Sequence, residues 1–166
     1  MIDVQRSMLE PPEPVPAAPA VSGVIGDLLG RARAAGAIVI HVRNNGTEDD
    51  PDLPGAPGWE LVHEVRQGEH VIDKYEPNSF ADTALSKLLP SGADLVVVGM
   101  QSEYCVRATS LAALEQGHTV MLVRGAHATY DGALPASAIA QQVEAELTGL
   151  GVSLVDDHEV VFRAPR

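Results

Sequence analysis

The sequence is poor in several residue types, and each shortage excludes something. Cys105 is the one cysteine among 166 residues, so no internal disulfide can form and the fold does not depend on an oxidising compartment. Lysine and arginine total 11 against 23 acidic residues, which gives a formal net charge of −12. An acidic chain argues against nucleic acid and anionic membranes as partners, because both select basic surfaces. No apolar run approaches the roughly 18 residues that a membrane span needs.

The rest of the composition is that of an ordinary globular domain. Hydrophobic residues make up 45% of the chain and charged residues 20%. The length fits one domain, and no repeat or linker divides it, so we expect a single domain over residues 1–166. The opening segment MIDVQRSMLEPPEP lacks a basic region followed by an apolar core. We therefore expect no signal peptide and a soluble, cytoplasmic protein.

Helical and extended patterns alternate along the chain. Helices are predicted over residues 21–35, 79–89, 104–116 and 136–147, and strands over the opening MIDVQ and residues 37–42, 70–73, 95–99, 119–123 and 152–155. Strands that alternate with helices of ten or more residues indicate βαβ units, and hence a parallel sheet with helices on both faces. The strands LVVVG and TVMLV are apolar throughout, as strands buried on both faces should be. The predicted fold is a three-layer α/β domain.

The aromatic residues gather where such a fold binds ligands. Ligands of open parallel sheets lie beyond the carboxyl ends of the strands. Of only six aromatic residues, five follow a predicted strand, namely Trp59, Tyr75, Phe80, Tyr104 and Tyr130. A long polar loop over residues 44–58 precedes the first of them, and structureless loops of more than about 12–15 residues are uncommon in compact domains. The aromatic side chains can line a pocket there, or equally cap the core or form a subunit interface.

Cys105 lies in the stretch DLVVVGMQSEYCVRATSL, a few residues after a buried strand. One interpretation is a small apolar filler, since free cysteine is among the most buried residue types. The other is a nucleophile, because Cys105 falls near the predicted start of a helix, where free N–H groups and the helix dipole favour an anion. Such a position lowers the pKa of a thiol and makes the reactive thiolate available near neutral pH.

Two charged residues stand out as partners for such a thiol. Asp3 lies inside the apolar opening strand, where a carboxylate is costly without a partner. Lys74 ends the strand HVID at the predicted carboxyl edge of the sheet. If the two meet the thiol, the three form a coupled set whose proton positions are decided by the group. The alternatives are a surface lysine and a frayed terminal aspartate, and none of the six histidines stands out by position.

Three blocks of the sequence resemble the isochorismatase-like cysteine hydrolases, a superfamily that includes nicotinamidases, N-carbamoylsarcosine amidase and streptothricin hydrolase. The blocks are MIDVQ, KYEPNSFADTALSKLL and VVVGMQSEYCVRATSLAALEQGHTVMLV. They occur in the family order and cover nearly the whole chain, and the third block is highly specific. The resemblance implies an isochorismatase-like fold with a central six-stranded parallel sheet. It also implies homo-oligomers, commonly dimers or tetramers.

The resemblance further implies an Asp–Lys–Cys triad. Asp3 is then the general base, Lys74 holds Asp3 and stabilises the thiolate, and Cys105 attacks the carbonyl to form a thioester. A cis peptide bond is implied between Met100 and Gln101, and an oxyanion hole from the backbone N–H groups of Gln101 and Cys105.

Substrate contacts are implied for Trp59, Phe80 and Tyr104. The metal site of nicotinamidases uses an Asp-x-His element after the second strand, which this chain lacks. We interpret the acidic residues of loop 47–52 as a solvated surface, and we expect no metal and no cofactor. The sequence therefore predicts a hydrolase of a small-molecule amide or related C–N bond. The alternative is a catalytically silent binding or assembly module with the same fold.

Overall fold

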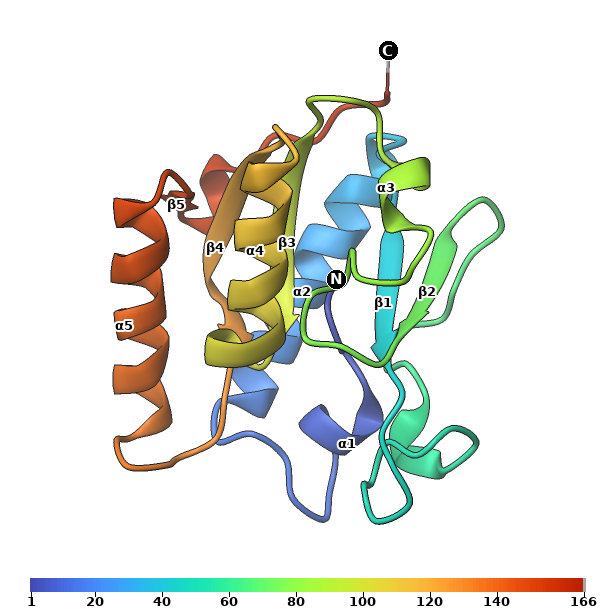
Figure 1. Cartoon of the computed structure of the whole chain (residues 1–166), viewed down its shortest axis with the longest axis vertical. Helices are drawn as coiled ribbons and strands as arrows, with labels where there is room; N and C mark the ends of the chain where they lie inside the picture. The colour runs from blue at the N-terminus through green and yellow to red at the C-terminus, as the bar shows by residue number, and fades with distance from the viewer. Residues whose placement is uncertain (166) are drawn as a thin grey trace.

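A computed structural model describes residues 1–165 of the chain (Figure 1). The α-helices are α1 (Arg6–Leu9), α2 (Ala18–Ala34), α3 (Leu85–Leu88), α4 (Arg107–Glu115) and α5 (Ala136–Gly149). The strands are β1 (Ile40–Asn44), β2 (His70–Lys74), β3 (Asp94–Met100), β4 (Thr119–Ala128) and β5 (Ser153–Val155). Two short 3-10 turns, η1 (Pro57–Trp59) and η3 (Asp157–Glu159), and one π-helix, η2 (Ser102–Val106), complete the described elements.

The strands form the middle of three layers. Helix α2 buries Ile25 and Leu28 against Val123 on one face of the strands. Helices α4 and α5 bury Ala113 and Leu147 in a second apolar cluster on the other face. Figure 1 shows the same arrangement, with α2 behind the strands and α4 and α5 in front of them. The predicted α/β class is confirmed, and its cause is the apolar strand sequence, which needs cover on both faces.

The strands do not form the single six-stranded sheet that the sequence predicted. The named strands pair only in parallel, but β1 pairs with β2 in one sheet and β3, β4 and β5 pair in another. The opening segment lies between the two sheets, where Ile2 makes isolated bridges to Val42 and Gly99. The N–H of Ile2 donates to the carbonyl oxygen of Val98 at 2.8 Å. The segment therefore connects the two sheets only through the bridges of Ile2. It does not form a sixth strand, because the next residue, Asp3, has a positive φ and leaves the extended conformation.

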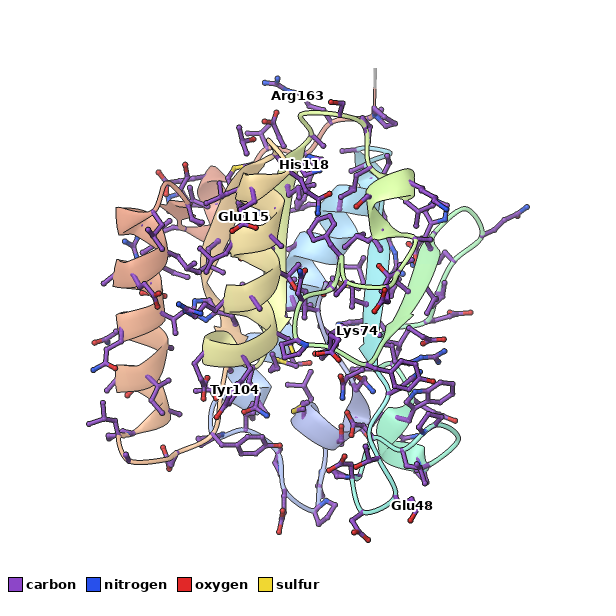
Figure 2. The ribbon with its side chains drawn as sticks, in the orientation of Figure 1. Glu48, Lys74, Tyr104, Glu115, His118 and Arg163 are labelled. Atoms are coloured by element: carbon purple, nitrogen blue, oxygen red, sulfur yellow. The ribbon has the colours of Figure 1, made fainter. Side chains whose placement is uncertain are left out.

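A cavity of about 680 Å³ lies at the amino ends of β1 and β3. Its mostly apolar lining includes Ile38, Phe80 and Val96. The ring of Phe80 stacks on that of His118, with 6.2 Å between the centroids. Figure 2 shows His118 near the upper end of the molecule and Lys74 nearer the carboxyl ends of the strands. The lining also includes Ile2 and Val42, so the cavity extends along the strands as far as the residues that contact Asp3.

The helix predicted over residues 79–89 is much shorter than expected. Only Leu85–Leu88 form α3, and Ser79, the first residue of the predicted helix, is fully buried ahead of it. The hydroxyl of Ser79 lies 2.7 Å from that of Thr109, and the hydroxyl of Thr83 donates to the carbonyl oxygen of Ser79. These side-chain bonds offer the backbone an alternative to the helix, as hydroxyl side chains commonly do.

Gly99 is the point of closest approach between the opening segment and β3. A Cβ atom there would overlap the backbone oxygen of Ile2, and the residue has a φ of 126°, which strongly favours glycine. We expect Gly99→Ala to destabilise the protein by at least about 3 kcal/mol, measured by denaturant unfolding.

Gly23→Ala in α2 is the matched control for the Gly99 variant. Nothing lies within 4 Å of its added Cβ, and the helical position favours alanine by up to about 1 kcal/mol. Equal stability changes in the two variants would contradict the assigned role of Gly99.

Candidate active site

Asp3 directly follows Ile2 in the opening segment, between β1 and β3. Its backbone N–H donates to the carbonyl oxygen of Val42 at 2.9 Å, and the residue is 1% exposed. Its φ of 49° is in the left-handed region, which is uncommon for residues other than glycine but most tolerated by aspartate and asparagine. The structure therefore holds this carboxylate inside the protein in an unusual backbone conformation, as is frequent at functional sites.

Lys74 ends β2 and is fully buried beside Asp3. Its Nζ lies 3.0 Å from Asp3 Oδ2, 3.0 Å from Asn44 Oδ1 and 3.3 Å from Cys105 Sγ. An ammonium has three protons to donate, and three acceptors surround this one. Lys74 is thus the group that brings the predicted carboxylate and thiol together.

Cys105 is half-buried in the π-helix η2, which follows β3 directly. Burial and, after it, the negative charge of Asp3 raise the pKa of its thiol to about 12, although Lys74 opposes both. A lowered pKa was expected under one of the two interpretations of the sequence, the nucleophile at a helix start, and the shift has the opposite direction. The cause is the loss of water around the sulfur, which disfavours the thiolate more than the nearby ammonium favours it.

Asp3 responds to the same burial. Its pKa is raised by burial and partly restored by Lys74 and by the Cys105 thiol. Asp3 Oδ1 is buried and has no hydrogen-bond partner among the described residues, so it can accept one proton. A proton that moves from sulfur to this oxygen leaves the net charge of the three side chains unchanged. The arrangement therefore suits a thiol that loses its proton to Asp3 during attack, with no free thiolate beforehand.

Two polar residues that the sequence did not single out, Asn44 and Gln5, lie beside Asp3, Lys74 and Cys105. Asn44, which accepts from Lys74, donates from its Nδ2 to Asp52 Oδ2 at 2.8 Å. Gln5 accepts from the N–H of Asn44 and donates to its carbonyl oxygen. Asn44 ends β1 and Gln5 belongs to the opening MIDVQ, so their positions at strand ends were a usable signal in the sequence.

The predicted substrate-contact residues lie in three different settings. Trp59 ends η1, donates from Nε1 to Asn45 Oδ1 at 2.8 Å, and has the Arg43 guanidinium 3.5 Å from its ring centroid. Tyr104, which is labelled in Figure 2, precedes Cys105 in η2 and is 59% exposed. Phe80 is 8% exposed in the core near the cavity described above. Their contact with a substrate stays a prediction.

The backbone leading to Cys105 has an unusual link. The peptide bond between Met100 and Gln101 is cis, at the position that the resemblance implied. The N–H groups of Tyr104 and Val106 both donate to the carbonyl oxygen of Gln101, which ties the π-helix to this link. The oxyanion role of the Gln101 and Cys105 N–H groups stays a prediction.

The acidic loop is more ordered than a solvated surface. Asp52 is 5% exposed and bonds to Asn44, whereas the exposed carboxylate of Asp50 accepts from the N–H and hydroxyl of Thr47. Among residues 1–165, no three His, Cys, Asp or Glu side chains are grouped closely enough to hold a metal ion. Within the same residues, each helix is too short or too polar to cross a membrane.

Comparison with known proteins identifies the family of the chain. The family model described as "Isochorismatase domain" matches residues 1–149. The chain belongs to the isochorismatase family. A curated relative in Streptomyces noursei, named streptothricin hydrolase, is 43% identical over 171 residues, which cover 99% of this chain and 61% of the relative. The chain thus spans less than two thirds of that relative's length.

Solved structures place the fold in the same family. An isochorismatase from Pseudomonas putida is 30% identical, with a TM-score of 0.89 over 97% of this chain and 88% of its own. N-carbamoylsarcosine amidase from Thermoplasma acidophilum has a TM-score of 0.82 over 96% of this chain and 95% of its own. Its identity is only 20%, so this second similarity concerns the fold alone. Hydrolases and an amidase therefore share this isochorismatase-like architecture.

Proposed function

We propose that this protein hydrolyses an amide, or a related C–N bond, of a small molecule through a thioester on Cys105. The observation that carries the proposal is the position of Lys74 Nζ, 3.0 Å from the Asp3 carboxylate and 3.3 Å from the Cys105 sulfur. A buried acid, a cation and a thiol in mutual contact at the strand ends suit nucleophilic catalysis. Family membership and the hydrolase relative support the same conclusion.

The first half-reaction forms the thioester. Sulfur attacks the carbonyl carbon while Asp3 takes the thiol proton, and Lys74 stabilises the negative charge that develops on sulfur. The carbonyl oxygen becomes an oxyanion, and the N–H groups of Gln101 and Cys105 stabilise it. Asp3 then delivers its proton to the leaving nitrogen as the C–N bond breaks.

The second half-reaction releases the acid. Water attacks the thioester carbon, and Asp3, now ionised again, accepts one proton of that water. The C–S bond breaks, and the sulfur regains its proton from Asp3. One water is consumed for each C–N bond cleaved, and the chain needs neither a metal ion nor a cofactor for these steps.

The substrate is proposed only as a class. The Streptomyces noursei relative bears the name streptothricin hydrolase, so streptothricin is the first compound to assay, beside a panel of small amides. Trp59 and Tyr104 are the aromatic side chains that we expect to face it. A cytoplasmic location and homo-oligomers stay predictions of the sequence.

A silent binding module remains the second candidate. The observation that favours it is the pKa of the Cys105 thiol, which burial raises to about 12. Ligand binding would then be insensitive to the loss of the thiol. The two functions differ in one measurable product, an acyl group on sulfur.

Cys105→Ala is expected to abolish turnover and to leave the fold intact, because a small half-buried side chain is shortened by one atom. Mass spectrometry should detect the addition of one water to the substrate with the unmodified protein, and an acylated Cys105 in the intact protein during turnover. Ser110→Ala is the control, since it also shortens a small buried side chain in the following helix, α4. Turnover by Cys105→Ala at the normal rate would sink the thioester mechanism.

A further inference from the structure

A row of hydrogen-bonded polar side chains, formed by Ser102, His127 and Glu144, lies beside the proposed triad and has no role in the steps above. The hydroxyl of Ser102 lies 2.8 Å from His127 Nδ1, and both residues are buried, at 0% and 4% exposure. His127 Nε2 lies 3.2 Å from Glu144 Oε1, and the Glu144 side chain is 16% exposed. The three side chains therefore form a line that runs from the interior to the surface.

The chemistry of the three groups fixes the direction of these hydrogen bonds. The Glu144 carboxylate can only accept, so His127 must donate to it from Nε2. In the neutral imidazole, Nδ1 then carries no proton and accepts from the Ser102 hydroxyl. The Ser102 side chain is held in one rotamer by a histidine that is itself held by a carboxylate.

The Ser102–His127–Glu144 row connects η2, β4 and α5 close to Cys105. Ser102 begins η2 and directly follows Gln101, while His127 lies on β4 in register with Gly99. Glu144 belongs to α5, on the face of the strands that also carries α4. Although serine, histidine and glutamate form hydrolase triads elsewhere, Ser102 has no exposed surface from which to attack a substrate. The Ser102–His127–Glu144 row is therefore suited to hold the backbone of residues 101–105 in position.

We propose that Ser102 and His127 are positioning residues for the oxyanion hole. They fix the backbone of residues 101–105, whose N–H groups at Gln101 and Cys105 receive the oxyanion in the proposed reaction. This inference rests on the proposed function, because it concerns the transition state of that reaction. Glu144 acts one step further away, since it orients only the imidazole.

The positioning role and a merely structural role predict different chemistry at one sulfur. Alkylation by iodoacetamide occurs at a saturated carbon and forms no oxyanion, so it reports the access and basicity of the Cys105 thiol. Acylation by p-nitrophenyl acetate passes through a tetrahedral oxyanion and releases p-nitrophenolate, so it also depends on the aim of the N–H groups. The ratio of the acylation rate to the alkylation rate therefore reports how well the N–H groups stabilise the oxyanion, independently of the reactivity of the thiol.

The experiment measures both rates by intact mass, on the full chain, for four variants and the unmodified protein. Ser102→Ala and His127→Ala are expected to lower the ratio of acylation to alkylation on the order of tenfold to a hundredfold, the loss that follows a displacement of about 1 Å. His127→Asn places an amide near the position of Nδ1, so it should recover part of the ratio. His118→Ala is the matched control, because it truncates a buried histidine at the opposite end of β4 and should leave the ratio unchanged.

Each outcome decides between the two claims. A ratio in Ser102→Ala and His127→Ala equal to that of His118→Ala overturns the positioning role and leaves the proposed function standing. If the unmodified protein is alkylated but never acylated at Cys105, the proposed function fails, and the positioning role fails with it. A lower ratio confined to the Ser102 and His127 variants, with partial recovery in His127→Asn, supports both.

Discussion

Asp3→Asn is expected to abolish turnover and at the same time to make Cys105 react faster with iodoacetamide. The two effects have opposite signs because Asp3 has two influences on the sulfur. Its negative charge raises the pKa of the thiol, so its removal lowers that pKa and increases the thiolate fraction at a given pH. The same carboxylate is the acceptor of the thiol proton in the proposed reaction, and asparagine cannot take that role.

The expected loss of turnover is on the order of 10²–10⁴-fold, the usual contribution of a general acid–base group. Alkylation should shift toward lower pH, because burial still raises the pKa of the thiol but the opposing charge is gone. The rates are measured between pH 7 and about 11, with intact mass as the readout for alkylation and product mass for turnover.

Asp73→Asn is the matched control. Asp73 neighbours Lys74 in β2, but its side chain is 44% exposed and bonds to Arg43 at 2.7 Å. Its removal should change neither rate by more than about twofold, since exposed charges interact weakly in water. Slower alkylation in Asp3→Asn would show that Asp3 favours the thiolate before attack, contrary to the mechanism proposed above.

Much of the candidate site could be predicted because it depends on topology. Asp3, Lys74 and Cys105 each lie at or just beyond the end of an extended segment, and the ends of neighbouring parallel segments meet at one edge of a sheet. The alternation of apolar strands and amphipathic helices placed Lys74 and Cys105 near that edge, and the resemblance to the isochorismatase-like cysteine hydrolases implied that Asp3 meets them there. The contacts of Lys74 with Asp3 and Cys105 agree with this reasoning.

The rest depends on packing between distant segments, which local patterns do not encode. The direction of the shift in the thiol pKa could not be decided from the sequence, because a helix start favours a lower pKa whereas burial by other elements raises it, and the extent of that burial is not visible in local patterns. The predicted helix over residues 79–89 failed for a similar reason, since Thr109, some thirty residues away, binds Ser79. Strand β4 was predicted to end at Val123 and extends to Ala128, which brings His127 beside Ser102.

Lys74→Met is expected to have the largest effect on stability. The substitution leaves the buried Asp3 carboxylate without its cation, and breaking a buried ion pair in this way costs about 3–5 kcal/mol. The double variant Asp3→Asn/Lys74→Met removes both charges and should be more stable than Lys74→Met alone. Denaturant unfolding of the four proteins in this cycle gives the coupling energy of the pair directly.

The pH dependence of the Lys74→Met variant tests the same idea independently. Without Lys74, the pKa of Asp3 is raised further, since burial is no longer opposed by the ammonium. A carboxyl whose folded pKa exceeds its unfolded value of about 3.9 binds its proton more tightly in the folded state. The loss of unfolding free energy caused by Lys74→Met should therefore be smallest at low pH, where Asp3 is protonated. The loss should grow as the pH rises through the folded pKa of Asp3.

Arg124→Met provides the scale for both Lys74 measurements. Arg124 and Asp156 form an ion pair at 3.2 Å with side chains that are 52% and 48% exposed, and such pairs contribute about 0–1 kcal/mol. If Lys74→Met costs no more than Arg124→Met at neutral pH, Asp3 is not held as an anion by Lys74. Asp3 would then already carry a proton at rest and could not act as the base for Cys105. A large cost that disappears in the double variant instead establishes the charged pair on which the proposed attack depends.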